Sequence, residues 1–178
     1  PKLASLHMIL LDNRFDVIAV SETWLTSDFP DSLLLNGSNY SVFRRDRVGK
    51  RGGGVCVFVS SSLRARQVQL DSPAEILSVD IHGAGDSLRL SVFYLPPARE
   101  ADAVRNLSDA VSLLRVSAPN SRFLCLGDAN MPSIRWGTVP SSPNQAEANF
   151  LQVLDSLSLS QMVSKPTRGQ NILDLCLV

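Results

Sequence analysis

Four apolar runs, each carrying one or two polar residues at an end or in its interior, constrain the fold of this chain more than any other feature. Short apolar runs bounded by turn residues are typical of buried β-strands. The runs are residues 16–22, 88–94, 123–130 and 171–178, and their polar residues are Glu22, Tyr94, Asp128 with Asn130, and Asp174. The pattern predicts one site that strand ends assemble from distant parts of the chain.

The run at 123–130 shows most clearly an apolar stretch that ends in polar residues. Its apolar part turns polar at Gly127, Asp128 and Asn130, and glycine permits a break or a close backbone approach. If the segment stays extended, Asp128 and Asn130 point to the same side because side chains alternate. An acid beside an amide can hold a water, a metal or a phosphate. The alternative is a plain Asp/Asn turn after a strand.

Length and composition narrow the class of protein. With 178 residues and 44% apolar content, we expect one soluble globular domain over residues 1–178. Lys+Arg and Asp+Glu are both 17, so a nucleic-acid binder would need a local basic patch. Cys56, Cys125 and Cys176 lie in apolar runs, which favours buried thiols over disulfides or zinc. We find no apolar stretch of membrane-spanning length and no secretion-signal pattern.

Hydrophobic periodicity predicts an alternation of helices and strands. Helices are expected at 2–13, 101–116 and 146–157, and a long connection at 26–39. Strands are expected at 17–20, 40–43, 55–59, 66–70, 75–81, 87–95, 123–126 and 171–178. Many strands adjoin in sequence, which favours an α/β sandwich with mixed sheets and outer helices over a uniform parallel sheet.

Two of the polar residues have alternative interpretations. Glu22 would share one side of an extended strand with Ile18 and Val20, where a buried carboxylate needs a partner such as a metal ion. It could instead be a surface glutamate beside an anchoring Trp24. Tyr94 is either a core aromatic or presents its hydroxyl to a ligand.

Two further features bear on binding. Asp174 would share its side of the last strand with Ile172 and Cys176, as a buried carboxylate that hydrogen-bonds a histidine ring or a backbone amide. The densest basic segment, 44–51, is either a solvated loop or a contact for a phosphate backbone. Its basic residues are Arg44, Arg45, Arg47, Lys50 and Arg51. The triple glycine at 52–54 lacks the rest of a P-loop and indicates a tight turn.

Six segments together resemble the exonuclease–endonuclease–phosphatase superfamily, and within it the apurinic-type endonuclease domain of non-LTR (LINE-type) retrotransposons. They occur in the order of that family, across nearly the whole chain. The segments are residues 16–25, 52–59, 94–97, 123–130, 166–168 and 172–175.

The resemblance implies a four-layered α/β sandwich of two mixed β-sheets flanked by helices, and metal-dependent cleavage of a DNA phosphodiester. By this resemblance Glu22 would bind Mg²⁺, with Mn²⁺ as an alternative, and Asp128 would position or deprotonate the attacking water. Asn130 would orient that water and the phosphate, Tyr94 would donate to the scissile phosphate, and Asp174 would support a catalytic histidine. Thr167, Arg168 and the basic residues of 44–51 would contact DNA.

The chain also departs from the family pattern. It begins at the helix that follows the family's first strand, and it carries no terminal Ser-Asp-His. Ala129 stands where an aromatic is usual, and Leu95 where an arginine is frequent. We therefore expect a fragment that lacks the first and last strands, with weak or no activity, because losing members of a catalytic unit costs orders of magnitude.

The expected function is a nuclear DNA endonuclease, made in the cytoplasm, that nicks target DNA for retrotransposon insertion by target-primed reverse transcription. Its partners would be DNA and a reverse transcriptase domain of the same polyprotein, with no membrane. Two alternatives stay open. One is a phosphoesterase of the same fold that acts on inositol phosphates or sphingomyelin. The other is an inactive remnant that serves as a binding module.

Overall fold

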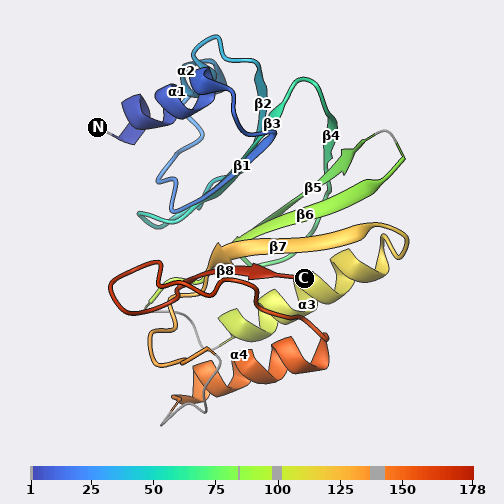
Figure 1. Cartoon of the computed structure of the whole chain (residues 1–178). Helices are drawn as coiled ribbons and strands as arrows, with labels where there is room; N and C mark the ends of the chain where they lie inside the picture. The colour runs from blue at the N-terminus through green and yellow to red at the C-terminus, as the bar shows by residue number, and fades with distance from the viewer. Residues whose placement is uncertain (1, 84, 98–101, 137–142) are drawn as a thin grey trace.

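The computed structural model describes residues 2–83, 85–97, 102–136 and 143–178, which fold into four layers (Figure 1). Helices α1 (Lys2–Asp12) and α2 (Asp31–Leu35) cover one sheet, and α3 (Ala103–Val116) and α4 (Gln145–Ser156) cover the other. The two sheets lie face to face between them. This confirms the predicted α/β sandwich with helices outside.

The smaller sheet has the strand order β1-β3-β2. Strands β1 (Val17–Ser21) and β2 (Tyr40–Arg45) both pair antiparallel with the central β3 (Val55–Ser60). Every residue of β3 is buried, and alternate side chains face opposite layers. Val55, Val57 and Val59 face the other sheet, whereas Phe58 packs with Leu10 of α1.

The larger sheet is mixed and has the order β4-β5-β6-β7-β8. Its members are β4 (Arg64–Gln67), β5 (Ile76–His82), β6 (Ser87–Tyr94), β7 (Arg122–Asp128) and β8 (Asp174–Leu177). Strands β6 and β7 are parallel, joined through α3, and all other pairs are antiparallel. The connection from β6 to β7 therefore carries a helix, as a parallel crossover requires.

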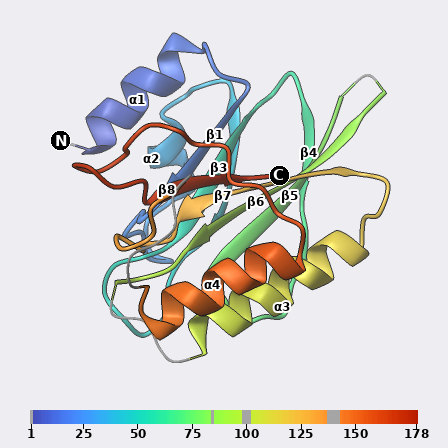
Figure 2. The ribbon, with the colours of Figure 1, turned by 60° about the horizontal axis from the view of Figure 1, so that its bottom comes forward.

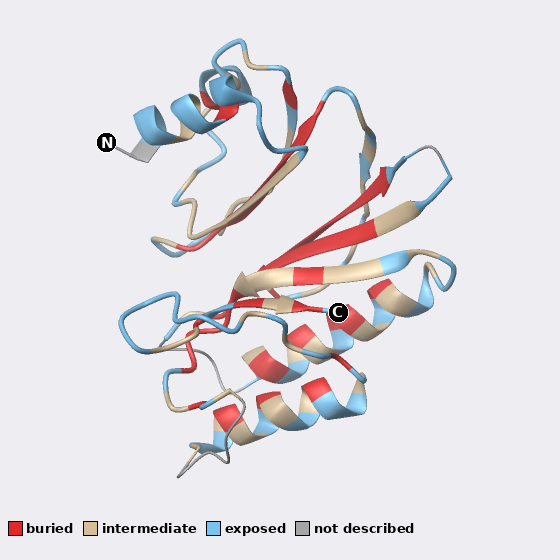
Figure 3. Ribbon diagram, viewed as in Figure 1, coloured by how far each residue is buried: buried red, intermediate tan, exposed pale blue. Residues whose placement is uncertain are grey.

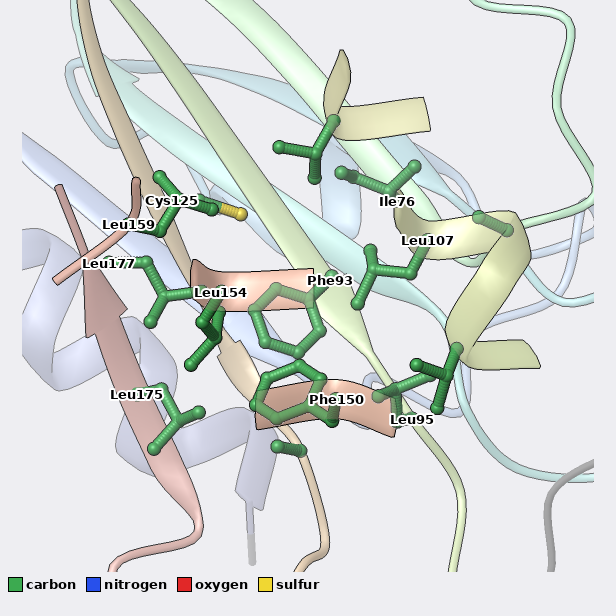
Figure 4. Packing of buried hydrophobic residues seen from close by; sticks show 14 of the residues in the cluster. Ile76, Phe93, Leu95, Leu107, Cys125, Phe150, Leu154, Leu159, Leu175 and Leu177 are labelled. Atoms are coloured by element: carbon green, nitrogen blue, oxygen red, sulfur yellow. The ribbon is translucent and has the colours of Figure 1, made fainter. Parts of the chain in front are cut away.

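Apolar side chains pack on both faces of the larger sheet, against the smaller sheet on one face and against α3 and α4 on the other. On its outer face, Phe93 of β6 packs against Phe150 and Leu154 of α4 and Leu107 of α3 (Figure 4). Helices α3 and α4 lie side by side below this face (Figure 2). Burial is concentrated on β3, β5 and β6, so the core lies at the centre of the sandwich (Figure 3).

Helix α4 begins with a capping box whose glutamate also binds the backbone of Ser133, shortly after the end of β7. The Asn144 side chain accepts from the backbone N–H of Glu147, and the Glu147 carboxylate accepts from the backbone N–H of Asn144. The other oxygen of the fully buried Glu147 accepts from the N–H of Ser133 at 3.1 Å. The segment that leaves the end of β7 is thereby held to α4.

Several expected boundaries differ from the structure. The connection at 26–39 contains the short helix α2, and the fourth strand is 64–67, not 66–70. The expected start at 101 of the second predicted helix lies outside the described residues, and the corresponding helix, α3, begins at Ala103. Cys56 and Cys125 are buried free thiols, but Cys176 is only half-buried because it lies on the open face of an edge strand. No helix in the described ranges is long and apolar enough to cross a membrane.

Candidate active site

Strand periodicity places three polar side chains on one face of the larger sheet. On β6, Leu90 and Val92 face the smaller sheet, and alternation places Tyr94 on the same face. On β7, Leu124 and Leu126 face the smaller sheet, and alternation places Asp128 on that face as well. Tyr94 pairs with Asp128 across β6 and β7, and Asp128 pairs with Asp174 across β7 and β8. The three residues are therefore neighbours in one row at one end of the sheet.

Glu22 reaches this row from the smaller sheet. The Tyr94 hydroxyl donates a hydrogen bond to Oε1 of Glu22 at 2.6 Å, which brings together residues 72 positions apart. The predicted convergence of polar groups from distant strands is found for Glu22, Tyr94, Asp128 and Asp174.

The backbone at Glu22 differs from the expected extension of β1. The strand ends at Ser21, and Glu22 and Trp24 both adopt left-handed φ angles, 55° and 57°. The N–H of Trp24 donates to the Gly53 carbonyl at 2.8 Å, and that of Thr23 to the Gly54 carbonyl at 3.1 Å. Left-handed non-glycine residues are costly and occur often at functional sites. Trp24 is 54% exposed, so the anchoring role considered for it is wrong.

The triple glycine makes this close approach feasible. Gly53 and Gly54 have φ angles of +70° and +83°, which L side chains rarely adopt. A Cβ on Gly54 would overlap the hydroxyl oxygen of Thr23. The turn expected at 52–54 is thus the surface against which the Glu22 segment is held.

Glu75 supports Tyr94 and was not predicted. Its carboxylate accepts from the N–H of Gly54 and from Nε of Arg47, at 2.8 Å for the latter, and its backbone carbonyl accepts from the N–H of Tyr94 at 3.0 Å. The Arg47 guanidinium lies over the Tyr94 ring, 5.3 Å from its centroid. The only sequence signal was a lone acid at the start of an apolar run, which is too common to single out.

Tyr94 is a buried hydrogen-bond donor. Burial, and then the hydrogen bond to Glu22, raise the pKa of its hydroxyl above the ordinary value. The hydroxyl therefore stays protonated at neutral pH and can donate to a negatively charged oxygen.

Asp128 and Asn130 form a compact turn at the end of β7. Oδ1 of Asp128 accepts from the N–H of Asn130 at 2.9 Å, and Asn130 has a left-handed φ of 48°. The extended conformation on which the same-side expectation depended therefore ends at Asp128, but the two side chains still lie together, because the Arg168 guanidinium reaches both. The Asn130 amide donates to the Leu95 carbonyl at 2.9 Å, so both residues are fixed beside Tyr94.

The charge state of Asp128 reflects its surroundings. Its side chain is buried, and this burial raises the pKa of the carboxyl group, with a further increase from nearby Asp174 and Glu22. The N–H of Asn130 and the guanidinium of Arg168 act in the opposite direction. Arg168 reaches Oδ2 of Asp128 at 3.3 Å and the Asn130 amide oxygen at 3.4 Å.

Asp174 is exposed, not buried as expected, because the face of β8 that carries it lies at the edge of the sheet. Its backbone N–H, like that of Leu173, donates to the hydroxyl oxygen of Thr167, at 3.1 Å and 3.0 Å respectively. Thr167 therefore fixes the backbone at the start of β8. A role for Thr167 in DNA contacts stays a prediction.

The basic residues of the segment 44–51 differ in their exposure: the first three arginines are half-buried, and the last two residues are exposed. Three of its arginines have partners within the protein. Arg44 pairs with Asp31 and Asp46, Arg45 donates to backbone carbonyls of Ile76 and Ser72, and Arg47 pairs with Glu75. Lys50 and Arg51 are exposed, and the Arg51 guanidinium lies over the Trp24 ring. Phosphate contacts by these five residues stay a prediction.

The donor set fits a divalent metal with an incomplete protein shell. Three carboxylates, Glu22, Asp128 and Asp174, are near enough that two of them raise the pKa of the third. A cation would relieve this excess negative charge. Within the described ranges, no group of three or more acidic, histidine or cysteine side chains is placed so that together they could hold a metal ion. Mg²⁺ takes only one or two carboxylates and keeps several waters, so the residues present fit such an ion.

Fold and site together define a deoxyribonuclease-like α/β sandwich with an acidic site at one end of its paired sheets. The chain belongs to the Endonuclease/Exonuclease/phosphatase family, whose family model matches residues 1–177. The resemblance found in the sequence is thereby confirmed at the level of the family. Members of this family are phosphodiesterases and nucleases that generally use divalent metal ions.

Solved structures with the same fold include nucleases and phosphatases. The endonuclease domain of TRAS1, a telomere-specific non-LTR retrotransposon, has a TM-score of 0.72 at 16% identity, covering 98% of this chain and 78% of that chain. The 3′–5′ exonuclease NExo of Neisseria meningitidis has a TM-score of 0.71 at 15% identity, covering 99% and 81%. The human Nocturnin catalytic domain has 0.63 at 15% identity, covering 99% and 73%. No curated protein matches the sequence significantly.

Proposed function

We propose that this chain is a divalent-metal-dependent endonuclease that hydrolyses a phosphodiester of DNA and leaves a nick. The observation that carries the proposal is the meeting of Glu22, Tyr94 and Asp128 at one end of the sandwich, joined by the hydrogen bond between the first two. These are residue types that hydrolysis of a phosphodiester can use: an oxygen ligand for a metal, a hydrogen-bond donor and a base.

Each residue has a chemical task in this proposal. Asp128, whose pKa is raised, accepts a proton from the attacking water as the water oxygen bonds to phosphorus. The bond between phosphorus and the 3′-oxygen breaks in the same step, and the leaving oxygen takes a proton from solvent to become the free 3′-hydroxyl. Tyr94 donates a hydrogen bond to a non-bridging phosphate oxygen, where negative charge increases in the transition state. Asn130 fixes Asp128 through its backbone N–H. Glu22, with Asp174 nearby, would hold Mg²⁺ or Mn²⁺, and the ion would supply charge stabilisation at the phosphate.

The retrotransposon context supports a specific use of the nick. The sequence resembles LINE-type endonuclease domains, and TRAS1 provides a solved structure of the same fold. In this proposal the nick is made in nuclear target DNA, and a reverse transcriptase domain of the same polyprotein extends the freed 3′-hydroxyl. Arg168, 3.3 Å from Asp128 and more than half exposed, is a cation that can contact the DNA phosphates.

A supercoiled-plasmid nicking assay with Mg²⁺ or EDTA tests the proposal. The wild type should produce open-circular plasmid only with Mg²⁺, and Asp128→Asn should lower the rate by orders of magnitude. Asp109→Asn, a substitution on the exposed face of α3, is the matched control and should leave the rate unchanged. Nicking that survives Asp128→Asn or EDTA would refute the assignment.

A second assay separates the alternatives. The same preparations would be offered an inositol phosphate and sphingomyelin. Hydrolysis of either with an intact plasmid would favour a phosphoesterase of the same fold. No hydrolysis of any substrate by folded protein would favour a remnant without catalysis.

A further inference from the structure

Strand β4 forms one edge of the larger sheet, and its outer face, the side that points away from the smaller sheet, is exposed. Ala65 packs toward the smaller sheet, so alternation places Arg64 and Arg66 on the outer face, where both are exposed. The strand residues packed beneath α3 and α4 come from β5, β6, β7 and β8, and among the described residues none comes from β4. No step of the hydrolysis described above uses this face.

The two arginines carry positive charge that is not taken up within the sheet. Neither guanidinium group has a hydrogen bond or ion pair with another described residue. Arg66 lies opposite Asp80 across the strand pair, but both oxygens of that carboxylate accept from the buried Arg89, at 2.7 Å and 2.8 Å. Arg64 lies opposite the exposed His82. The outer face of β4 therefore has an excess of positive charge in a chain whose net charge is zero.

This face lies at the end of the larger sheet opposite to the candidate active site (Figure 1). His82, opposite Arg64, pairs with Ser87 at the start of β6, whereas Tyr94 ends that strand. At about 3.3 Å per residue, the two ends of β6 are roughly 23 Å apart. Duplex DNA has a persistence length of about 150 base pairs, so a short stretch bound at Tyr94 does not turn back to β4.

The chemistry of the face suits the phosphate backbone of a duplex. Arg64 and Arg66 are two residues apart on one side of a strand, roughly 7 Å, so each can contact a phosphate of the same nucleic-acid strand. Proteins that bind single strands stack the bases on aromatic side chains. The large exposed aromatic side chains of the described residues are Phe15 and Trp24, and neither lies on the larger sheet. Contacts to the backbone alone do not depend on DNA sequence.

We propose that the outer face of β4 binds the phosphate backbone of a second duplex segment of the target DNA, remote along the molecule from the segment at Tyr94. Arg64 and Arg66 supply the contacts, and no bond is made or broken there. In long DNA, binding at the active site keeps remote segments close to the protein, so a weak second contact adds to the total affinity. This inference rests on the proposed function, because it takes DNA as the substrate.

The test compares DNA that can reach both sites with DNA that reaches only one. Filter binding in EDTA gives Kd for a supercoiled plasmid and for a stiff duplex of about 20 base pairs, with both concentrations expressed in base pairs. The wild type should bind the plasmid about tenfold more tightly. The slope of log K against log salt should be steeper for the plasmid by about two, because each phosphate contact adds about 0.9. The double variant Arg64→Gln, Arg66→Gln should remove both differences and keep the Kd of the short duplex.

Controls and outcomes keep the two proposals separate. The double variant Arg64→Lys, Arg66→Lys keeps both charges and should keep the plasmid preference, as should Arg14→Gln, which removes an exposed arginine next to α1. Circular dichroism confirms that each variant is folded. Equal Kd values for the two DNAs, or a preference that survives the double glutamine variant, would overturn the second site. Metal-dependent nicking without the preference overturns only this inference. A preference that needs both arginines, without any nicking, overturns only the proposed catalysis.

Discussion

The hydroxyl of Tyr94 donates to Oε1 of Glu22 at 2.6 Å, and this bond joins the two sheets at the candidate active site. Tyr94 ends β6 of the larger sheet, and Glu22 follows β1 of the smaller one. The relative position of the sheets therefore sets the distance between the hydrogen-bond donor Tyr94 and the proposed metal ligand Glu22. Catalytic geometry in this protein depends on how the sandwich packs as well as on local turns.

Tyr94→Phe removes the hydroxyl and keeps the buried ring under Arg47. We expect kcat for nicking to fall roughly a hundredfold with little change in KM, because the lost donor acts on charge that develops in the transition state. Steady-state kinetics on a defined duplex measure both constants. Tyr40→Phe is the matched control, since the Tyr40 hydroxyl donates to the Phe15 carbonyl in the smaller sheet. An equal loss in both variants would indicate a general effect on folding.

Polar residues at the ends of apolar runs were sufficient to predict that Glu22, Tyr94, Asp128 and Asp174 converge, and strand alternation accounts for the face on which they lie once the strands are paired. Leu90 and Val92 face inward, and a period of two then requires Tyr94 to do the same. Asp128 follows from the same argument on β7. The face of a sheet on which a side chain lies depends on the alternation of apolar and polar residues along the strand, and a single sequence shows that alternation directly.

Contacts between residues far apart in the sequence could not be predicted from local patterns of this kind. The left-handed conformation of Glu22 depends on backbone hydrogen bonds from Thr23 and Trp24 to the glycine turn at 52–54, about thirty residues away. Glu75 joins that turn to Tyr94 through a side chain that no periodicity distinguishes. Asp174 was expected to be buried because its neighbours are apolar, but an edge strand leaves one of its faces exposed.

Asp128→Asn should stabilise the protein while it abolishes activity. The raised pKa of Asp128 means that the folded state favours the neutral carboxyl, so its contribution to stability is present below the unfolded pKa, near 4, and is lost as pH rises through the folded value. The amide keeps the acceptor for Asn130 without the buried charge. We expect a higher Tm at pH 7, where about 2–4 °C corresponds to 1 kcal/mol, and no gain near pH 4. A lower Tm at pH 7 would contradict this account.

Gly127→Ala should destabilise the protein because Gly127 lies against β6. A Cβ there would overlap the Phe93 carbonyl oxygen and lie 2.6 Å from Cδ1 of the Phe93 ring. Since overpacking a core costs about 1–3 kcal/mol or more, urea denaturation should show a loss of at least that size. Gly83→Ala is the control, because among the described residues beyond its chain neighbours its added Cβ would meet only the Asp86 carbonyl oxygen, at an ordinary contact distance of 3.9 Å. Equal stability of the two variants would contradict the close approach.

Arg168→Gln should move the acid limb of the pH–rate profile to higher pH. The guanidinium of Arg168, 3.3 Å from Asp128, lowers the pKa of that carboxyl group, so its removal raises the pKa and the base form is reached only at higher pH. The Arg168 side chain is 56% exposed, so the shift should be small and should shrink in high salt. Arg168→Lys keeps the charge and should leave the limb in place. If Arg168 serves only as a phosphate contact, Arg168→Gln will raise KM without moving the limb, and profiles of kcat/KM against pH at two salt concentrations distinguish these results.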